Sequence, residues 1–550
     1  MAPKFDTIRE IEHIWPLLSG IRVLVVMDGI AGSGHYASFG PGDQSTNPLS
    51  GGAYFGLSEF IHTLTTSTFP TIFVTKAHRD TDVRNAQDIA NFRFDQHDLS
   101  VYDVIFLFGV AGVGETVAPM SDPELVALAT FMDGGGGVFA TGDHADLGVE
   151  LNGRVPRVRS MRKWYFPNTG PLGEPVAPPP IGTARIETTQ PGHNETFLHF
   201  DDQSDDIPQP LTLRWYSQNV NIFTARRYPH ALLCGPNGPI TVAPDHMHEG
   251  EVILPWDVDA TLTFGGQHFV EYPTSPTGDR PLPEIVAWGK VLMETNTSTE
   301  SAHIGDPTHI AQGRTFGVVG AYDGHRAGVG RVAVDSTWHH FFDINLIGDP
   351  IAPSPKTLGF NASSDGQKVL ADIQAYFKNL VVWLARPNAL KRVFASAALF
   401  TLRSQPLAMI VDGRTKYTFS DLTEIGDLAL KNIYRLIPPC SALVLILPYF
   451  VAGPVRVFPP DPWAKVGPKD LSFVDPLIYL RTALGHAIAA LAVERDRLFQ
   501  ADPEEAVARI VRVVEHGVAT GMRGLGDELE HYAESIGRVA KGLKGSAAAQ

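Results

Sequence analysis

A run of four consecutive glycines, residues 134–137, is the feature that most constrains how this chain of 550 residues folds. It ends a stretch with helical periodicity over residues 123–132, and the short apolar run 138–140 follows it directly. This pattern is typical of a helix, a tight turn and a short buried strand. Ionisable residues come soon after the apolar run: Asp143, His144 and Asp146. Because ligands bind at the carboxyl ends of strands in open α/β sheets, we expect these three residues to belong to a functional site.

Further apolar runs predict the rest of a sheet. Residues 21–27 and 102–109 are almost continuously apolar, as in buried parallel strands. Shorter strands are expected at 70–75, 221–225, 240–243, 315–322 and 330–335, and helices at 54–64, 123–132 and 282–294. Strands that alternate with helices at this spacing predict an α/β fold, with a mostly parallel sheet and helices on both of its faces.

The chain is too long for one ordinary core, so we expect more than one domain. Residues 15–350 form the predicted α/β domain, in which the proline-rich and acidic region of about 150–215 is an inserted loop region. A Pro/Ser/Asn-rich linker at 351–365 precedes a predicted α-helical domain at 365–545. Helical periodicity in that domain covers 366–384, 422–436, 475–500 and 503–539. We expect this domain to provide a surface for a protein partner or for homo-oligomerisation.

The charge and cysteine content exclude several classes of function. The formal net charge is −16, from 44 basic and 60 acidic residues, so we expect neither nucleic acid nor a membrane as partner. A local basic cluster stands out against this background: Arg154, Arg157, Arg159, Arg162 and Lys163. The two cysteines, Cys234 and Cys440, are too few for a disulfide framework or a cysteine-based zinc site. The first residues lack the pattern of a signal peptide, and the most apolar uncharged run, 441–455, is too short to span a membrane, so a cytoplasmic location is expected.

The first candidate for chemistry is the group of Asp143, His144 and Asp146. A carboxylate and an imidazole at a strand end can bind a divalent metal, or can act as a base and the group that orients it. The alternative is structural: the two aspartates cap the following turn and His144 is hydrogen-bonded in the core.

A second candidate lies at residues 245–251. His246 and His248 alternate, so in an extended chain both imidazoles point to the same side. Glu251 offers an oxygen ligand beside them, and a histidine pair with nearby carboxylates suits a divalent metal. The alternative is a charged surface loop without a ligand.

A third candidate follows the predicted strand 330–335. The segment carries the residue types of a Ser/His/Asp arrangement: Asp335, Ser336, His339 and His340. Ser336 lacks the Gly-x-Ser-x-Gly context that exposes a nucleophile on a sharp turn, so a histidine of this segment is the stronger candidate. We therefore expect His339 to be a catalytic residue.

A glycine motif after the first strand, Gly32-Ser-Gly34, is similar to a dinucleotide-binding turn. In such a turn the glycines open a helix directly, whereas here a loop with two prolines runs on to about residue 52. The second strand also ends in Thr75 and Lys76 without the expected acidic residue. No nucleotide cofactor is therefore expected.

Taken together, several of these segments resemble the class I glutamine amidotransferase-like superfamily, and in particular its branch similar to the ThuA (trehalose-utilisation) proteins. The matching segments are 23–29, 102–109, 125–145 and 330–335 with His339. The resemblance covers roughly residues 20–345. It implies a flavodoxin-like sheet with a site at the turn that follows the glycine-rich strand, where His144 fits a histidine of ThuA-like proteins.

The chain departs from that superfamily at the nucleophile. True amidotransferases carry a cysteine on this turn, whereas the turn here is Gly142-Asp143-His144 and no cysteine is near it. Glutamine hydrolysis through a thioester is therefore not expected. Three options stay open: metal-assisted chemistry, acid–base chemistry without a covalent intermediate, and a ligand-binding domain without catalysis.

Our hypothesis is a metal-assisted hydrolase that acts on a polar or sugar-like small molecule. The expected catalytic residues are Asp143, His144, Asp146 and His339. The expected ligands of a divalent metal ion are His144, His246, His248 and Glu251. The alternative is a non-catalytic ligand-binding or scaffold protein whose helical domain binds partners.

Overall fold

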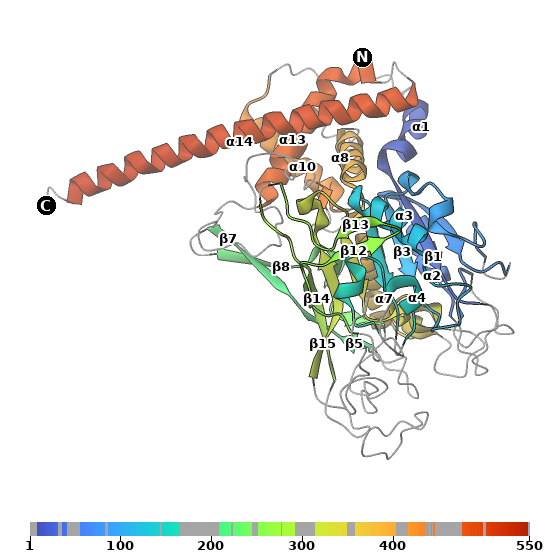
Figure 1. Cartoon of the computed structure of the whole chain (residues 1–550). Helices are drawn as coiled ribbons and strands as arrows, with labels where there is room; N and C mark the ends of the chain where they lie inside the picture. The colour runs from blue at the N-terminus through green and yellow to red at the C-terminus, as the bar shows by residue number, and fades with distance from the viewer. Residues whose placement is uncertain are drawn as a thin grey trace. The chain divides into compact units, whose positions relative to one another are not determined.

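The structure of this protein is a computed structural model. It describes residues 8–30, 36–40, 55–82, 86–143, 146–164, 208–221, 224–244, 251–276, 278–291, 314–348, 358–402, 416–435, 437, 442, 444–445, 476–498 and 502–547. The chain divides into two compact units, whose helices and strands are labelled in Figure 1. The larger unit comprises Ile21–Tyr216 and Tyr228–Pro387, and the smaller unit comprises Met1–Gly20, Ser217–Arg227 and Asn388–Gln550.

An eight-stranded sheet forms the centre of the larger unit. Its strands lie in the order β2 (Thr71–His78), β1 (Gly20–Met27), β3 (Val104–Phe108), β4 (Gly137–Thr141), β16 (Val332–Asp335), β15 (Arg314–Tyr322), β14 (Glu284–Val291) and β6 (Thr212–Leu213). The strands β1, β3, β4 and β16 pair in parallel, whereas β16, β15, β14 and β6 pair antiparallel. The predicted α/β fold class is confirmed.

Within the predicted helix at 282–294 the structure has a strand, Glu284–Val291, so that prediction is wrong. Over its length β14 pairs with β15 on one side, and it pairs with β6 on the other. Its residues include the β-branched Ile285 and Val286 and the aromatic Trp288, which pack well on a pleated surface. Pairing on both edges outweighs the weak helical periodicity of this segment.

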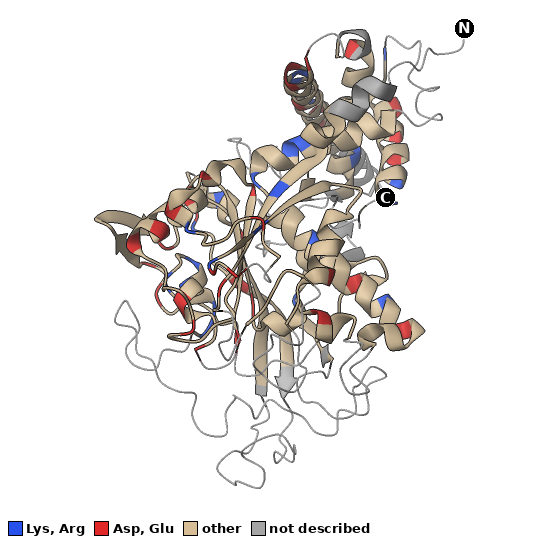
Figure 2. Cartoon of the chain, turned by 90° about the vertical axis from the view of Figure 1, so that its right-hand side faces the viewer, with Lys and Arg blue, Asp and Glu red and all other residues tan. Residues whose placement is uncertain are grey.

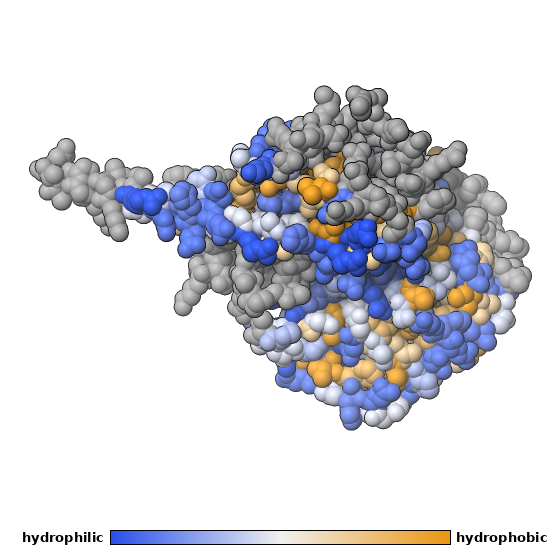
Figure 3. Space-filling model, turned by 90° about the horizontal axis from the view of Figure 1, so that it is seen from above, coloured by the Kyte–Doolittle hydropathy of each residue, from blue (hydrophilic) through white to orange (hydrophobic). Residues whose placement is uncertain are grey.

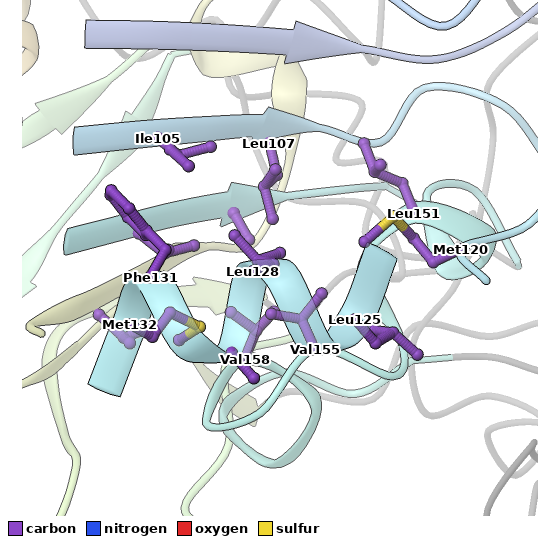
Figure 4. Close-up of a cluster of buried hydrophobic side chains, with 14 of the residues drawn as sticks. Ile105, Leu107, Met120, Leu125, Leu128, Phe131, Met132, Leu151, Val155 and Val158 are labelled. Carbon is purple, nitrogen blue, oxygen red and sulfur yellow. The ribbon is translucent and has the colours of Figure 1, made fainter. Parts of the chain in front are cut away.

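One face of the sheet packs against α3 (Asp122–Asp133). Side chains alternate between the two faces of a strand, so Ile105 and Leu107 of β3 point to the same side. Both belong to a buried cluster with Leu125 and Leu128 of α3, which Figure 4 shows between the helix and the sheet. The helix begins after the N-cap Ser121, whose backbone N–H donates to the Glu124 carboxylate at 3.1 Å.

The opposite face of the sheet carries an aromatic layer. Phe106 and Phe108 each lie 5.4 Å, between ring centroids, from Phe60 of α2 (Ser58–Thr65). The Phe60 ring also lies 5.1 Å from Phe377 of α7 (Ser364–Leu384). Helices therefore cover both faces, as predicted. Because α7 packs here, it belongs to the larger unit, although the sequence placed residues 366–384 in the helical domain.

Close packing explains the four glycines that precede β4. Gly135 has a φ of +86°, which favours a residue without a side chain. A Cβ at Gly136 would lie 2.3 Å from the Phe131 ring, and one at Gly137 would lie 2.1 Å from the Leu384 carbonyl oxygen at the end of α7. The run therefore lets the chain reverse tightly after α3 and lets α7 approach the start of β4.

The smaller unit is helical over most of its described part. Its helices are α1 (Ile8–Ser19), α8 (Pro387–Leu402), α10 (Phe419–Ile433), α13 (Pro476–Leu498) and α14 (Pro503–Ala547). Glycine allows α10 and α13 to touch through their backbones: a Cβ at Gly426 would lie 1.9 Å from the Arg481 carbonyl oxygen, and one at Gly485 would lie 1.8 Å from that of Leu422. The predicted helices at 422–436, 475–500 and 503–539 are confirmed.

The other α-helices and strands of the described chain are mostly short. These are α4 (Val149–Asn152), α5 (Val158–Met161), α6 (Asp343–Leu346), β5 (Gln209–Pro210), β7 (Trp215–Asn221), β8 (Thr224–Pro229), β9 (Cys234–Gly235), β10 (Gly238–Pro239), β11 (Val242–Ala243), β12 (Thr261–Phe264) and β13 (Gln267–Val270). Among the described residues one helical segment, Leu477–Glu494 of α13, is long and apolar enough to cross a membrane. Of that segment 56% is buried within the structure.

A buried aspartate connects two distant parts of the larger unit. Asp343 of α6 accepts hydrogen bonds from the Ser58 hydroxyl at 2.7 Å, the Ser58 N–H at 3.1 Å and the Glu59 N–H at 2.8 Å. It therefore caps the N-terminus of α2 from far along the chain. Burial raises the pKa of Asp343 to about 6, and the hydrogen bonds at α2 oppose that rise.

We predict that Asp343→Ala destabilises the protein by about 1–3 kcal/mol, because it leaves helix N–H groups without their acceptor. The matched control is Asp365→Ala, at the exposed ion pair with Lys368, where we expect a change within about 0.5 kcal/mol. Thermal unfolding followed by calorimetry measures both. Equal effects of the two substitutions would contradict the capping role.

Candidate functional site

The candidate site lies where β4 and β16 end. These strands are parallel neighbours, with Asp335 opposite Thr141, so the residues that follow them lie side by side. Asp143 comes two residues after β4, and His339 comes four residues after β16. The structure places His339 Nε2 3.7 Å from Asp143 Oδ2, and both side chains are buried. Two predicted catalytic residues that are far apart in sequence therefore lie together.

The ring of His339 is held in a defined orientation. Its Nδ1 lies 3.2 Å from the Asn345 Oδ1, and the ring centroid lies 4.2 Å from that of Trp338 and 5.8 Å from that of Phe55. The backbone N–H of His339 donates to the Thr337 hydroxyl at 3.1 Å. In the tautomer with its proton on Nδ1, His339 donates to the Asn345 amide oxygen, and Nε2 is then the acceptor nitrogen on the side of Asp143.

A buried arginine joins the two strand ends. Arg162 donates from one guanidinium nitrogen to the carbonyl oxygens of Asp143 and Ser336, both at 2.8 Å. Its guanidinium also lies 4.5 Å from the centre of the Trp164 ring. Burial lowers the pKa of Arg162 to about 10, against the opposing effects of Asp143 and Asp335. Arg162 thus remains a cation at neutral pH, and it fixes the backbone on both sides of the Asp143–His339 pair.

A second network of buried polar groups lies at the end of β16. Asp335 Oδ1 is 2.7 Å from Nδ1 of His340, and Asp335 Oδ2 accepts a hydrogen bond from the Tyr376 hydroxyl at 2.8 Å. Burial and the Asp335 charge raise the pKa of Tyr376. This network ties the end of β16 to α7. The hydroxyl of Ser336 makes no hydrogen bond with any described residue, so neither described histidine of the segment is placed to activate it.

The other predicted catalytic residues have different positions. The Asp146 carboxylate accepts a hydrogen bond from the Val113 N–H at 2.9 Å, so it holds the loop after β3, and its catalytic role stays a prediction. His144 lies outside the described residues.

The predicted metal ligands are only partly described. His246 and His248 lie outside the described residues, as does His144. Glu251 Oε2 lies 3.8 Å from Lys163 Nζ, and the next residue, Val252, forms a β-bridge with Arg162. Glu251 and Val252, which follow the two histidines in sequence, therefore lie next to Arg162, the arginine that contacts Asp143. In the part of the chain that is described, no group of three or more His, Cys, Asp or Glu side chains could hold a metal ion, and the metal site stays a prediction.

The basic cluster at 154–163 serves the fold of the larger unit. Arg154 pairs with Asp122, Arg157 with Asp133, Arg159 with Glu271 and Lys163 with Glu251, while Arg162 binds carbonyl oxygens. Figure 2 shows the same mixing, with basic and acidic residues interspersed over the face in view. These side chains therefore do not form an unpaired basic patch of the kind that binds phosphate.

Asp28, the acidic residue at the end of the first strand, is a second buried carboxyl to which the sequence analysis gave no role. Asp28 is fully buried after β1, and its Oδ1 accepts hydrogen bonds from the Val110 N–H at 2.7 Å and the Ala111 N–H at 3.2 Å. Its Oδ2 has no hydrogen-bond partner among the described residues. Burial raises the pKa of Asp28 to about 7. Asn345 and Arg162 were also missed, because only the tertiary structure brings them to the pair.

Comparison with known proteins gives no family for this chain. No model of a known protein family matches it, and no curated protein matches its sequence.

Asp28 gives a prediction for the pH dependence of stability. Its pKa is about 7 in the folded protein and near 3.8 in the unfolded chain, so between these values the folded state retains a proton that the unfolded state has lost. The contribution of Asp28 to the free energy of unfolding is therefore highest below pH 3.8. It falls as the pH rises and is lost once the pH has passed 7. Asn does not titrate. The free energy of unfolding of Asp28→Asn is therefore expected to rise, relative to that of the wild type, by up to about 4 kcal/mol between pH 4 and pH 8.

Chemical denaturation of both proteins at several pH values measures this difference. A difference in the free energy of unfolding that stays constant from pH 4 to pH 8 would show that Asp28 does not titrate in this window.

Proposed function

We propose that the larger unit is a hydrolase that acts on a polar or sugar-like small molecule, with the Asp143–His339 pair at its reaction centre. The observation that carries the proposal is the 3.7 Å approach of His339 Nε2 to Asp143 Oδ2 at the carboxyl ends of two parallel strands. This distance exceeds a hydrogen bond, so a water molecule beside the pair is able to donate one hydrogen to each acceptor. A site at this edge of an α/β sheet is the usual place for a ligand.

The chemistry follows from the orientation of the ring. His339 Nε2 takes a proton from the attacking water, while the Asn345 amide oxygen keeps the other proton on Nδ1. The Asp143 carboxylate lies beside the imidazolium that forms and stabilises its positive charge. The protonated His339 then gives its proton to the leaving group of the substrate. No covalent intermediate is needed, in keeping with the absence of a cysteine or an activated serine at this turn.

A divalent metal ion extends this proposal. The proposed ligands are His144, His246, His248 and Glu251, a set of imidazoles and one carboxylate that suits zinc, manganese or iron. The position of Glu251 supports it, because the Lys163 N–H donates to the Glu251 carbonyl oxygen at 2.8 Å, next to Arg162 in the chain. Such an ion would supply charge that lowers the pKa of a bound water.

The order of the strands also supports the resemblance to amidotransferase-like proteins. The order β2-β1-β3-β4 is that of flavodoxin-like sheets, and β16 occupies the next place. Asp143 then stands on the turn where an amidotransferase has its cysteine. We propose a fold of this kind whose nucleophile has been replaced by acid–base chemistry, in a cytoplasmic protein.

The second candidate function is ligand binding without catalysis, and a cavity in the smaller unit favours it. This cavity of about 560 Å³ is lined by residues of α10, α13 and α14. Apolar side chains such as Leu422 and Val513 form part of its wall, and His486, Arg512 and His516 add polar groups. Its size and composition are those of a small-molecule site. In this alternative, removal of His339 would leave ligand binding unchanged.

The reaction is tested with a panel of chromogenic esters, amides, glycosides and phosphates of small polar molecules. For any substrate that the wild type hydrolyses, His339→Gln and Asp143→Asn should each lower kcat at least roughly 100-fold, because each removes a group of the proton transfer. His268→Gln, at an exposed histidine of β13, is the control and should retain full activity. A variant of the pair with unchanged kcat on every substrate would exclude this centre.

Elemental analysis of the purified protein tests the metal. We expect about one zinc, manganese or iron per chain, lost in a His144→Ala, His246→Ala double variant and retained in His268→Ala. If neither the wild type nor the variants hold metal after incubation with divalent ions, the metal is excluded and the acid–base centre of Asp143 and His339 stands by itself.

A further inference from the structure

The cavity of the smaller unit lies against the first half of α14. Residues of α10 and α13 form the rest of its wall. Figure 1 shows α14 as the long helix that ends at the C-terminus, and Figure 3 shows mostly hydrophilic residues on the side of its C-terminal half that faces the viewer. The volume of about 560 Å³ is ample for an amino acid or a molecule of similar size.

Two glycines of α14 set its register against α13. A Cβ at Gly517 would lie 2.8 Å from the His486 carbonyl oxygen, and a Cβ at Gly521 would lie 2.8 Å from Cγ of the His486 ring. Tyr479, nearer the start of α13, shares a hydrophobic cluster with Leu525, which is further along α14. The two helices are therefore antiparallel. Residues before Gly517 in α14 consequently lie beside residues after His486 in α13.

His486 lies at one end of the cavity. Its Nδ1 is 2.9 Å from the carbonyl oxygen of Thr482, and because a carbonyl oxygen only accepts, the ring carries its proton on Nδ1. Burial lowers the pKa of His486, so the ring is neutral at neutral pH. No described residue donates to Nε2, which is therefore an acceptor without a donor in a ring that lines the cavity. A hydroxyl group of a ligand would supply that donor.

Opposite charges line the other end of the cavity. Glu494 follows His486 by eight residues, or roughly 12 Å along the axis of α13. Arg512 precedes Gly517 in α14, so the antiparallel register brings it to the end where Glu494 lies. Arg512 is exposed and has no ion pair among the described residues. Glu494 has a contact of its own, but a carboxylate has about four lone-pair sites and accepts from more than one donor.

The wall between these two ends is largely apolar. Ala489, Ala490 and Val493 of α13 and Val513 of α14 line it, and Tyr417, His516 and Thr520 add polar groups. A complementary ligand therefore has an apolar body between a hydroxyl donor at one end and both an ammonium and a carboxylate group at the other.

We propose, on the basis of the second candidate function, that this cavity binds an amino acid whose apolar side chain ends in a hydroxyl, as in tyrosine. The hydroxyl donates to Nε2 of His486, the carboxylate pairs with Arg512 and the ammonium group donates to Glu494. The side chains of His486 and Glu494 both lean toward the start of α13, so their polar ends are separated by a distance similar to that of their backbones. With a hydrogen bond of about 2.9 Å at each end, roughly 6 Å is left for the ligand, which suits a side chain as long as that of tyrosine.

Competition against labelled tyrosine in equilibrium dialysis tests each group of the ligand on the wild-type chain. Phenylalanine lacks the hydroxyl, tyramine lacks the carboxylate and hydroxyphenylpropionate lacks the ammonium group. Each should compete at least roughly tenfold less well than unlabelled tyrosine, because each leaves one group of the cavity without its partner. Tyrosine that shows no saturable binding, or phenylalanine that competes as well as tyrosine, would overturn the proposal.

Arg512→Gln connects the carboxylate of the ligand to its residue. It should weaken tyrosine at least roughly tenfold and leave the directly measured affinity for tyramine within about threefold, because tyramine has no carboxylate to lose. Normal binding of tyramine also shows that the variant is folded. Arg509→Gln, on the same helix but outside the cavity wall, is the control and should leave both affinities within about threefold. An unchanged affinity of Arg512→Gln for tyrosine would contradict the proposed orientation of the ligand.

Two further variants separate this ligand from the functions proposed above. His339→Gln, in the larger unit, should leave the binding of tyrosine unchanged whether or not it abolishes hydrolysis. Val513→Trp fills the cavity and should abolish the binding of tyrosine. If another small molecule binds the wild type but not Val513→Trp, while tyrosine binds neither, the cavity remains a ligand site and the proposed ligand class is wrong.

Discussion

The parallel pairing of β4 with β16 is the interaction on which the rest of the larger unit depends. It joins segments almost two hundred residues apart and sets Asp335 opposite Thr141. The register decides which residues follow the two strands side by side, and a shift of one residue would turn every side chain to the other face. His339 reaches Asp143 only because this register holds. Arg162 and the chain of Asp335, His340 and Tyr376 strengthen it from both sides.

Two buried arginines of the larger unit are each compensated by one carboxylate. Arg79 donates to Glu124 at 2.5 Å inside the core of the larger unit, and Arg331 donates to Asp323 at 2.6 Å. Both arginines are about 1% exposed, so the loss of either carboxylate would leave a buried cation without its partner. Asp28 differs from these residues, because backbone N–H groups are its only hydrogen-bond donors among the described residues and burial raises its pKa. A buried carboxyl whose pKa is raised in this way is able to exchange a proton near neutral pH.

The predicted and observed structures agree where a segment's own pattern is strong. The continuous apolar runs 21–27 and 102–109 are strands, the glycines end α3, and the long amphipathic pattern after residue 503 is a helix. They differ at β14, where short apolar periodicity gave no reliable choice between helix and strand. At the site, Asp143 and His339 were predicted from residue type and strand ends. Asn345 was not, because a single asparagine six residues beyond a histidine carries no signal without the turn between them.

The sequence by itself determined the α/β class, the edge of the sheet at which polar residues gather and the helical character of the C-terminal part, because each depends on local apolar periodicity and glycine placement. Only the tertiary structure decided the strand order, the place of α7 against the sheet and the 3.7 Å approach of Asp143 to His339. These features depend on which strands become neighbours. That choice is made by packing between distant segments and leaves no periodic trace in either one.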